Sequence, residues 1–359
     1  MKICMTFVGL TLSNGVARSA MAIANLLVEK KNVDVTLIPV FKYDREAMKY
    51  LNSNVKVQKP LLPFYFRGLA KILLLFPARL LYNLFIREKY DIEIAFQYEV
   101  PTYIISGSTN SKAKHYCWMH GYDEGLRYRS CYEKMDKMVL VSKFAADRFK
   151  KEIGSLVPVE YCYNPIDDNE IILYGGENID IERGDSVLFV SVGRMTPEKG
   201  FGRLLDIYYK LKKENYRFNV WLVGEGLEYD ILRNKCNELG LSDMVKFWGS
   251  QSNPHKFTSR ADVFICSSFS EGYSTACTES IMLGIPVITT NCSGGAEIIE
   301  EAECGILTEM DDESLYKGIK TVLDNPQLIV EWKNKLKITK KRFSQAERAN
   351  QLFRVLEIC

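Results

Sequence analysis

Short apolar runs typical of β-strands alternate with longer amphipathic stretches along nearly the whole chain. The amphipathic stretches repeat their apolar residues at the 3.6-residue period of a helix that buries one face, most clearly at 201–214. This alternation predicts an α/β protein built from parallel sheets. The strand-like runs are residues 2–9, 33–40, 91–97, 114–121, 137–142 and 157–164 in the first half, and 186–193, 218–224, 244–249, 262–268, 286–290 and 305–309 in the second.

A polar stretch that contains Pro165 and ends at Gly184 separates the two series of strands. Because 359 residues exceed the roughly 100–200 residues of a usual domain, we expect two domains. The boundaries that we expect are a first domain at 1–167, a linker at 168–185, a second domain at 186–330 and C-terminal helices at 331–359. Two doubly wound, Rossmann-like domains would face each other across a cleft lined by the carboxyl ends of their strands.

Composition excludes several classes of protein. The 47 basic and 45 acidic side chains leave a net charge of +2, which is too even for a protein that functions by binding nucleic acid. The ten cysteines show no CxxC spacing and only three histidines are present, so we expect no metal site of thiolates and imidazoles. The N-terminus is typical of a strand and loop rather than a signal peptide, and no apolar run approaches the ~18 residues of a spanning helix. Free cysteines in the cytoplasm are expected.

The first candidate for chemistry is the segment from Gly193 to Gly200, which joins a buried strand to a helix. Lys199 lies where a helix begins, and there the helix dipole disfavours a cation. A bound anion would reverse that cost, since Arg194, Lys199 and free helix N–H groups together form a phosphate cradle. The alternative is that both are solvated loop charges, with Glu198 offsetting Lys199.

The second candidate is a pair of carboxylates after the strand at 262–268. Glu271 lies in the loop at the carboxyl end of that strand, and Glu279 lies in the early turns of the helix that follows. Sugar or ribose hydroxyls would supply the donors that such carboxylates need. The alternatives are a surface carboxylate at 271 and a capping-box residue at 279, although the capping box would require Ser or Thr where Ala276 stands.

Two candidates in the first half are weaker. The loop before Gly15 follows the first strand, where a doubly wound fold binds phosphate, but it lacks the GxGxxG pattern. His120 ends a predicted strand, and a single histidine there is more often a hydrogen-bonded structural residue. No Asp-x-Asp pair follows an apolar strand, so a metal-bridged diphosphate is not indicated.

Together these elements resemble the retaining nucleotide-sugar glycosyltransferases of the GT-B fold with an E-x7-E motif, the group 1 or family-four type. The offset from Glu271 to Glu279 is that of E-x7-E. In the first half the match is looser, and Asn14 precedes Gly15 where the family often has a glycine pair. The matching segments are SNGVARSA, YDIEIAFQ, WMHG, LVSKFAADRF and YNPID in the first half, and VGRMTPEKG, LVGEGLE, FWGSQSN, SEGYSTACTESIMLGIPVITT and SGGAEII in the second.

The resemblance implies a role for each matching residue. The first domain would be acceptor-side, the second would bind the donor, and the C-terminal helices would pack back toward the first. Arg194 and Lys199 would neutralise the donor diphosphate, and Glu279 would bind the ribose. The residues implied in catalysis are Glu271, His120, Arg194 and Lys199; those implied in donor binding are Gly15, Arg194, Lys199, Gly272, Tyr273, Ser274 and Glu279.

The expected activity is therefore that of a metal-independent, cofactor-free retaining hexosyltransferase of the EC 2.4.1 type. It would move a hexose or N-acetylhexosamine from a UDP-sugar to a saccharide or lipid-linked acceptor in surface polysaccharide or glycolipid synthesis. The alternatives are a nucleotide-sugar epimerase or sugar-phosphate synthase of the same fold, and a catalytically silent GT-B scaffold subunit. A two-lobed sugar receptor would need an export signal.

The segment 59–89 is both basic and apolar. Residues 30–90 carry 12 basic and 4 acidic side chains, and Glu88 is the one acid within 59–89. One interpretation is a pair of helices that pack on the first sheet with solvated cations. The other is a surface that touches an anionic membrane, or the acceptor, on the inner face of the plasma membrane. The residues predicted for that contact are Phe64, Tyr65, Arg67, Lys71 and Arg79.

Overall fold

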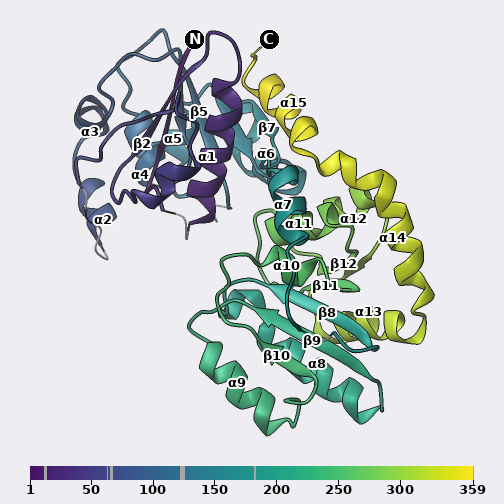
Figure 1. Ribbon diagram of the computed structural model, residues 1–359. Coiled ribbons are helices and arrows are strands. Elements are labelled where there is room, and N and C mark those ends of the chain that lie inside the picture. The colour runs from purple at the N-terminus through teal and green to yellow at the C-terminus, as the bar shows by residue number, and fades with distance from the viewer. Residues whose placement is uncertain (12–13, 63, 65–67, 122–125, 182, 359) are drawn as a thin grey trace. The chain divides into compact units, whose positions relative to one another are not determined.

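The structure is a computed structural model that describes residues 1–11, 14–62, 64, 68–121, 126–181 and 183–358. The chain divides into two compact units, one of Met1–Ile166 with Arg348–Cys359 and one of Asp167–Glu347 (Figure 1). Each unit has a parallel sheet and a hydrophobic core of its own. The α/β class and the two Rossmann-like domains expected from the sequence are confirmed.

The sheet of the first unit has the strand order β3-β2-β1-β4-β5-β6-β7, and all its neighbouring strands are parallel. The order reverses between β1 and β4, which is the switch point at which such sheets bind ligands beyond their carboxyl ends. The strands are β1 (Lys2–Phe7), β2 (Asp34–Pro39), β3 (Lys56–Val57), β4 (Ile92–Ala95), β5 (Lys114–Met119), β6 (Lys137–Leu140) and β7 (Val159–Tyr161).

Two helices of the first unit, α1 and α6, begin at residues whose side chains cap them. Asn14 accepts a hydrogen bond from the backbone N–H of Val16 at the start of α1, and Ser142 accepts one from Ala145 at the start of α6. The buried carboxylate of Glu93 on β4 accepts a hydrogen bond from Tyr82 of α3 at 2.8 Å, which ties that helix to the sheet. The helices are α1 (Gly15–Val28), α2 (Leu69–Leu73), α3 (Ala78–Phe85), α4 (Val100–Ile105), α5 (Arg129–Tyr132) and α6 (Lys143–Ile153).

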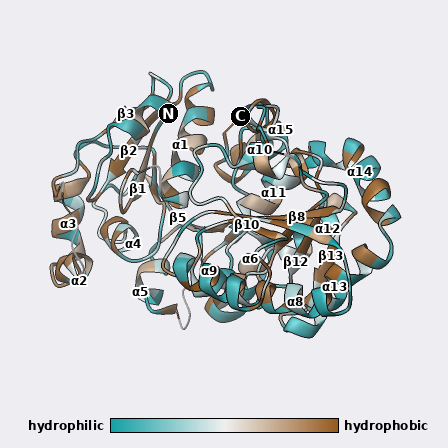
Figure 2. Cartoon of the chain, turned by 60° about the horizontal axis from the view of Figure 1, so that its bottom comes forward, coloured by the Kyte–Doolittle hydropathy of each residue, from teal (hydrophilic) through white to brown (hydrophobic). Residues whose placement is uncertain are grey.

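The sheet of the second unit has the order β10-β9-β8-β11-β12-β13 and is also parallel. Figure 2 colours β8 and its neighbours brown, for hydrophobic, because strands covered by helices on both faces bury nearly every side chain. The strands are β8 (Val187–Val192), β9 (Phe218–Val223), β10 (Val245–Phe247), β11 (Val263–Cys266), β12 (Val287–Thr290) and β13 (Ile306–Thr308).

The helices of the second unit are amphipathic. The predicted helix at 201–214 is α8, and its predicted apolar face is buried at Leu204, Leu205, Ile207, Tyr208 and Leu211. The helices are α7 (Asp168–Gly175), α8 (Phe201–Lys213), α9 (Tyr229–Glu238), α10 (His255–Thr258), α11 (Thr275–Met282), α12 (Gly295–Ala302), α13 (Asp312–Asp324) and α14 (Gln327–Thr339), and α15 (Gln345–Val355) crosses from this unit into the first.

The segment at 168–185, expected as a linker, begins instead with a packed helix. Asp167 caps α7 by accepting a hydrogen bond from the backbone N–H of Glu170. Asn253 donates a side-chain hydrogen bond to the carbonyl of Tyr174 at 3.0 Å, and Ser259 donates one to Gly175 at 2.7 Å. Residues 168–175 are therefore part of the second unit, because a capped helix with buried partners is no longer a free connection.

The C-terminal segment at 331–359, expected as one set of helices, is shared between the units. Helix α14 lies in the second unit, whereas most of α15 belongs to the first. There the side chain of Gln351 accepts a hydrogen bond from the backbone N–H of Tyr163, and Lys137 donates to the carbonyl of Val355 at 2.9 Å. No helix within the described residues is long and apolar enough to cross a membrane.

Candidate functional site

Two loops at the carboxyl edge of the second sheet bring the main candidates together. Strands β8 and β11 are parallel neighbours, so the loops that follow them leave the sheet at the same edge. The first loop leads through Arg194 and Lys199 into α8, and the second leads through Glu271 into α11. Lys199 and Glu271 are 72 residues apart in the sequence, and the sheet topology makes their loops adjacent.

Lys199 and Glu271 form an ion pair. Their Nζ and Oε1 atoms are 2.6 Å apart, and the two side chains are only 23% and 14% exposed. Ser268 donates a further hydrogen bond to the same Oε1 at 2.7 Å. Burial disfavours the charged form of Lys199, but the Glu271 carboxylate more than offsets this, so the pKa of Lys199 is raised. Lys199 is therefore not a solvated loop charge and Glu271 is not an unpaired surface carboxylate, whereas Arg194 is exposed.

Backbone contacts hold the two loops in register. Ser267 donates its hydroxyl to the carbonyl of Lys199 at 2.9 Å, and the backbone N–H of Phe269 donates to the carbonyl of Glu198 at 2.8 Å. Gly200 has a φ of +67°, and a Cβ there would lie 2.3 Å from the carbonyl oxygen of Ser267. Glycine is required at this position, because a side chain would force the loops apart.

Arg203 is a positioning residue that the sequence did not indicate. Its buried guanidinium donates to the carbonyls of Ser267 and Ser268, and it donates to the carbonyl of Met310 at 2.7 Å. The ring of Phe269 lies 3.9 Å from the guanidinium carbon. Burial lowers the pKa of Arg203. The apolar periodicity at 201–214 places Arg203 in helix α8, but only the fold shows that Arg203 supports the loop before Glu271.

The start of α8 is suited to an anion. Its N-cap is Gly200, which has no side chain to cap the first turn, and that turn contains no acidic residue. The helix runs for 13 residues, so its N-terminal N–H groups carry a positive partial charge. Lys199 directly precedes this end, as expected.

Arg194 is exposed, but its backbone is fixed. The N–H of Met195 donates to the carbonyl of Glu225 at 2.9 Å. Gly224 has a φ of +133°, and a Cβ there would lie 1.9 Å from the carbonyl oxygen of Gly193. The segment GEG at 224–226 thus serves to clamp the loop that carries Arg194, and it does so without being a dinucleotide fingerprint.

Glu279 lies in the second turn of α11. The N-cap is Ser274, which accepts a hydrogen bond from the backbone N–H of Cys277, so Glu279 is not the capping-box residue. Its Oε2 lies 3.9 Å from Nδ1 of His255, whose ring is parallel to the ring of Tyr174 with centroids 6.4 Å apart. His255 and Tyr174 are neighbours that sequence reasoning missed.

The other residues expected to hold the sugar form the turn between Glu271 and α11. Ser293 donates to the carbonyl of Gly272 at 2.9 Å. The ring of Tyr273 is buried against Gly294, where a Cβ would lie 2.4 Å from it. Tyr273 therefore anchors the turn with its side chain, and only its backbone remains as the predicted sugar contact.

Cys266 adds a thiol next to Glu271. Its pKa is lowered to about 6 by a hydrogen bond with the Cys277 thiol, although burial and the Glu271 charge act in the opposite direction. Its sulfur lies 4.0 Å from Oε1 of Glu271. The nine described cysteines are all buried and free. Among the described side chains, no group of three or more His, Cys, Asp or Glu could hold a metal ion.

Gly15 and His120 belong to the first unit. Gly15 is the first residue of α1, and a Cβ there would meet no described atom within 4 Å. His120 follows β5, and its ring centroid lies 4.5 Å from that of Phe96. Its Nε2 is buried without a hydrogen-bond partner in the described part of the chain, and burial lowers its pKa to about 3. The imidazole is therefore neutral at physiological pH.

The predicted membrane-contact residues are only partly described. Phe64, Lys71 and Arg79 are exposed in the first unit. Tyr65 and Arg67 lie outside the described residues.

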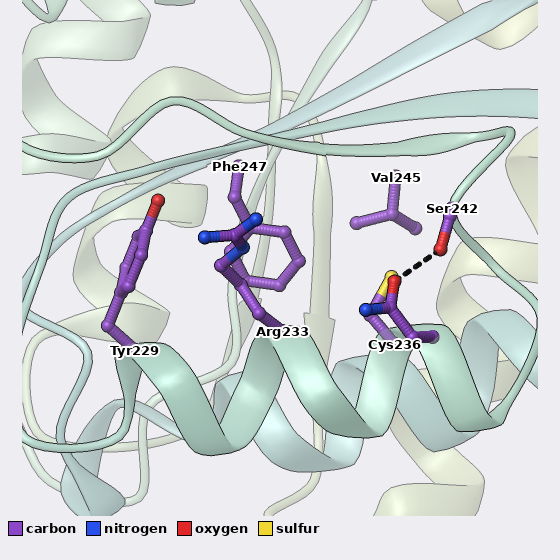
Figure 3. Close-up of a pocket in the computed structure, with 7 residues that line it drawn as sticks. Tyr229, Arg233, Cys236, Ser242, Val245 and Phe247 are labelled. Atoms are coloured by element: carbon purple, nitrogen blue, oxygen red, sulfur yellow. Dashed lines mark hydrogen bonds between the residues drawn. The ribbon is translucent and has the colours of Figure 1, made fainter.

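A pocket of about 280 Å³ lies away from these residues, between α9 and β10 (Figure 3). Figure 3 shows Tyr229 and Arg233 rising from α9 beside Phe247, and the hydroxyl of Ser242 donates to Asn237 at 2.6 Å. The pocket shares no residue with the predicted site and lies beside β10, the edge strand of the second sheet.

Residues 178–341 match the model of the family described as glycosyl transferases group 1. The chain is 31% identical to an N-acetylgalactosamine-N,N'-diacetylbacillosaminyl-diphospho-undecaprenol 4-alpha-N-acetylgalactosaminyltransferase of Campylobacter jejuni. The alignment extends over 199 residues, which are 55% of this chain and 53% of that protein. It is 32% identical over 145 residues to the lipopolysaccharide core biosynthesis glycosyltransferase LpsD of Rhizobium meliloti, and this alignment covers 40% of this chain and 41% of that protein. The chain thus spans about half the length of these curated relatives or less.

A solved structure covers the whole fold. The Anabaena protein Alr3699/HepE in complex with UDP aligns with a TM-score of 0.73 over 99% of this chain and 100% of that one, at 19% identity. At this identity the likeness shows the fold alone, which is the GT-B fold expected from the sequence.

Proposed function

We propose that this protein is a retaining glycosyltransferase that uses a UDP-sugar, because residues 178–341 match the glycosyl transferases group 1 family. It transfers a hexose or N-acetylhexosamine to a saccharide or lipid-linked acceptor in the synthesis of a surface polysaccharide or glycolipid. The observation that carries the proposal is the Lys199–Glu271 pair at the start of α8, a helix end without a side-chain cap. A cation, a helix N-terminus that can bind an anion and a carboxylate that can accept hydrogen bonds from hydroxyl groups lie there together.

Each end of the donor has a matching group. Arg194, Lys199 and the N-terminal N–H groups of α8 bind the diphosphate, and they stabilise the negative charge that develops on the leaving phosphate. Glu271 accepts hydrogen bonds from the hydroxyls of the transferred sugar, together with the backbone of Gly272, Tyr273 and Ser274. Glu279 accepts hydrogen bonds from the ribose hydroxyls.

The first unit contributes His120 and Gly15 in this proposal. His120 is neutral, so its proposed role is that of a hydrogen-bonding group and not of a cation. No described atom lies within 4 Å of the position that a Cβ of Gly15 would take, and the role proposed for Gly15 is a close backbone approach to the diphosphate.

The reaction needs no metal and no cofactor in this proposal. The bond from the anomeric carbon to the phosphate oxygen breaks, and the electron pair goes to the leaving UDP. The acceptor hydroxyl attacks from the same face, and its proton passes to the leaving phosphate oxygen, so the configuration is retained. No protein base is assigned.

The relatives support the substrate class by their names. One is named for an acceptor carried on diphospho-undecaprenol and for N-acetylgalactosamine, and another for lipopolysaccharide core biosynthesis. The aligned structure holds UDP. We place the reaction in the cytoplasm, because buried free cysteines are typical of a reducing compartment.

The test is release of UDP from a panel of UDP-glucose, UDP-galactose and their N-acetyl derivatives, followed by mass spectrometry. We expect one donor to be hydrolysed slowly, with or without EDTA, and Glu271→Gln to abolish the release. Lys212→Met is the matched control, since Lys212 pairs with Asp243 at the surface of the same unit. UDP binding without turnover of any donor would favour a silent scaffold, and an epimerised nucleotide sugar would favour an epimerase.

A further inference from the structure

Helices α2 and α3, the turn between them and Phe64 before them expose a set of large apolar side chains. Leu75 is 83% exposed, and the others are between 45% and 54% exposed. They come from a span of 21 residues, whereas exposed apolar residues elsewhere in the first unit are scattered singly. We call this set the α2–α3 surface: Phe64, Ile72, Leu75, Phe76, Leu80 and Leu84.

The fold holds these helices in place with other side chains of the same segment. Leu73, Leu81 and Phe85 are buried in the core of the first unit. The hydroxyl of Tyr103 on α4 donates to the carbonyl of Phe76 at 3.1 Å. Both helices are therefore anchored, and the α2–α3 surface is what remains outside after the segment has contributed to the core.

Cations accompany the apolar residues. Lys71 and Arg79 are exposed on the same two short helices, and Arg87 and Lys89 are exposed just after α3. The acid of this segment, Glu88, lies 3.5 Å from Lys2, which offsets its charge. A partner for this surface must accept apolar side chains and carry negative charge.

We propose that the α2–α3 surface docks on an anionic lipid bilayer. The bilayer offers acyl chains to leucine and phenylalanine and phosphate groups to lysine and arginine, and the two contributions to the binding free energy add. A second copy of the chain would bring like charges together, which disfavours it as the occupant. Helix α3 has eight residues and α2 has five, so the side chains insert shallowly and the attachment is reversible.

Figure 2 shows brown, hydrophobic stretches on both α2 and α3 next to teal ones. The α2–α3 surface consists of Phe64 and of described residues in these helices and in the turn between them, and it includes neither Tyr65 nor Arg67. It goes beyond the proposed activity, because binding to a vesicle requires no nucleotide. A failure of one therefore leaves the other intact.

The experiment is flotation of the full chain with vesicles of phosphatidylcholine alone or mixed with phosphatidylglycerol, at low and high salt. We expect binding to the anionic vesicles only, and weaker binding as salt rises. Lys71→Gln with Arg79→Gln should weaken binding roughly 25-fold, at about fivefold for each basic residue. Leu75→Ser with Leu80→Ser should weaken it about tenfold or more.

The control is Leu227→Ser, because Leu227 is 88% exposed in the second unit and does not lie on this surface. It should float like the wild type. Circular dichroism and UDP binding should be unchanged in all variants, which separates lost docking from lost folding. Failure of the wild type to bind anionic vesicles at low salt would overturn the proposal. So would a dimer seen by light scattering that Leu75→Ser with Leu80→Ser dissolves.

Discussion

Removing Lys199 should destabilise the second unit as well as weaken binding. In Lys199→Met the Glu271 carboxylate keeps the hydroxyl of Ser268 but loses its cation, at a position where the side chain is 14% exposed. Breaking a fully buried pair in this way costs about 3–5 kcal/mol, and partial exposure reduces this to about 2–3 kcal/mol. For a unit of this size that is a loss of roughly 5–10 °C in Tm.

The reverse change should cost less. In Glu271→Gln the amide oxygen still accepts a hydrogen bond, and the Lys199 ammonium is 23% exposed and can turn toward water. We expect this variant to lose about 1 kcal/mol of unfolding free energy. The double variant contains no unpaired charge, so it should be more stable than the sum of the single variants predicts, by about 1–2 kcal/mol.

The assay is urea unfolding of the four proteins, followed by circular dichroism and by tryptophan fluorescence. Lys212→Met is the control, because Lys212 and Asp243 form a pair of 2.8 Å that is exposed and should contribute about 1 kcal/mol or less. If the Lys199 and Glu271 effects add within about 0.5 kcal/mol, the two residues do not interact and the reasoning is refuted.

The other predictions concern one residue each. Glu279→Gln should weaken UDP binding about tenfold in calorimetry, and unchanged affinity would argue against the ribose contact. Gly224→Ala places a methyl group 1.9 Å from the carbonyl oxygen of Gly193 and should cost about 2 kcal/mol or more in urea unfolding, whereas Gly202→Ala, inside α8, should not destabilise. His120 has its pKa lowered from 6.5 to about 3, so the unfolded chain takes up a proton that the folded chain refuses as pH falls below 6.5. Stability at pH 5 should be lower by roughly 2 kcal/mol, and His120→Phe should lack that loss.

The repeating patterns of the sequence were enough to predict both sheets. Buried strands are continuous apolar runs, and helix α8 repeats its apolar residues with a clear period, so local pattern determines these elements. The boundary between the two units was harder to predict from the sequence. Residues 168–175 form a short run that begins with three polar residues and ends at a glycine, and their contacts with α10 and α11 make them a helix of the second unit.

The site was predicted in its residues but not in its contacts. Spacing and loop position identified Lys199 and Glu271 separately, because each follows a strand. Their ion pair joins segments 72 residues apart, and it depends on β8 and β11 being neighbours in the sheet. Arg203 was missed for a related reason. An arginine in an amphipathic helix is usually solvated, and its burial follows from carbonyl groups that the sheet brings to it from a distant loop.

In the proposed function, one ion pair contacts two unlike parts of a nucleotide sugar, and the hydrogen bonds of the pair are consistent with this. Lys199 uses one of its three N–H donors on Glu271, so it retains donors for a phosphate at the start of α8. The hydrogen bonds to Glu271 within the described residues all reach Oε1, so Oε2 retains its lone pairs for hydroxyl groups. Because Gly200 and Ser267 fix the two loops against each other, the donors and the acceptors cannot drift apart. The proposed function therefore predicts that this pair binds a diphosphate linked to a sugar more tightly than phosphate or sugar alone.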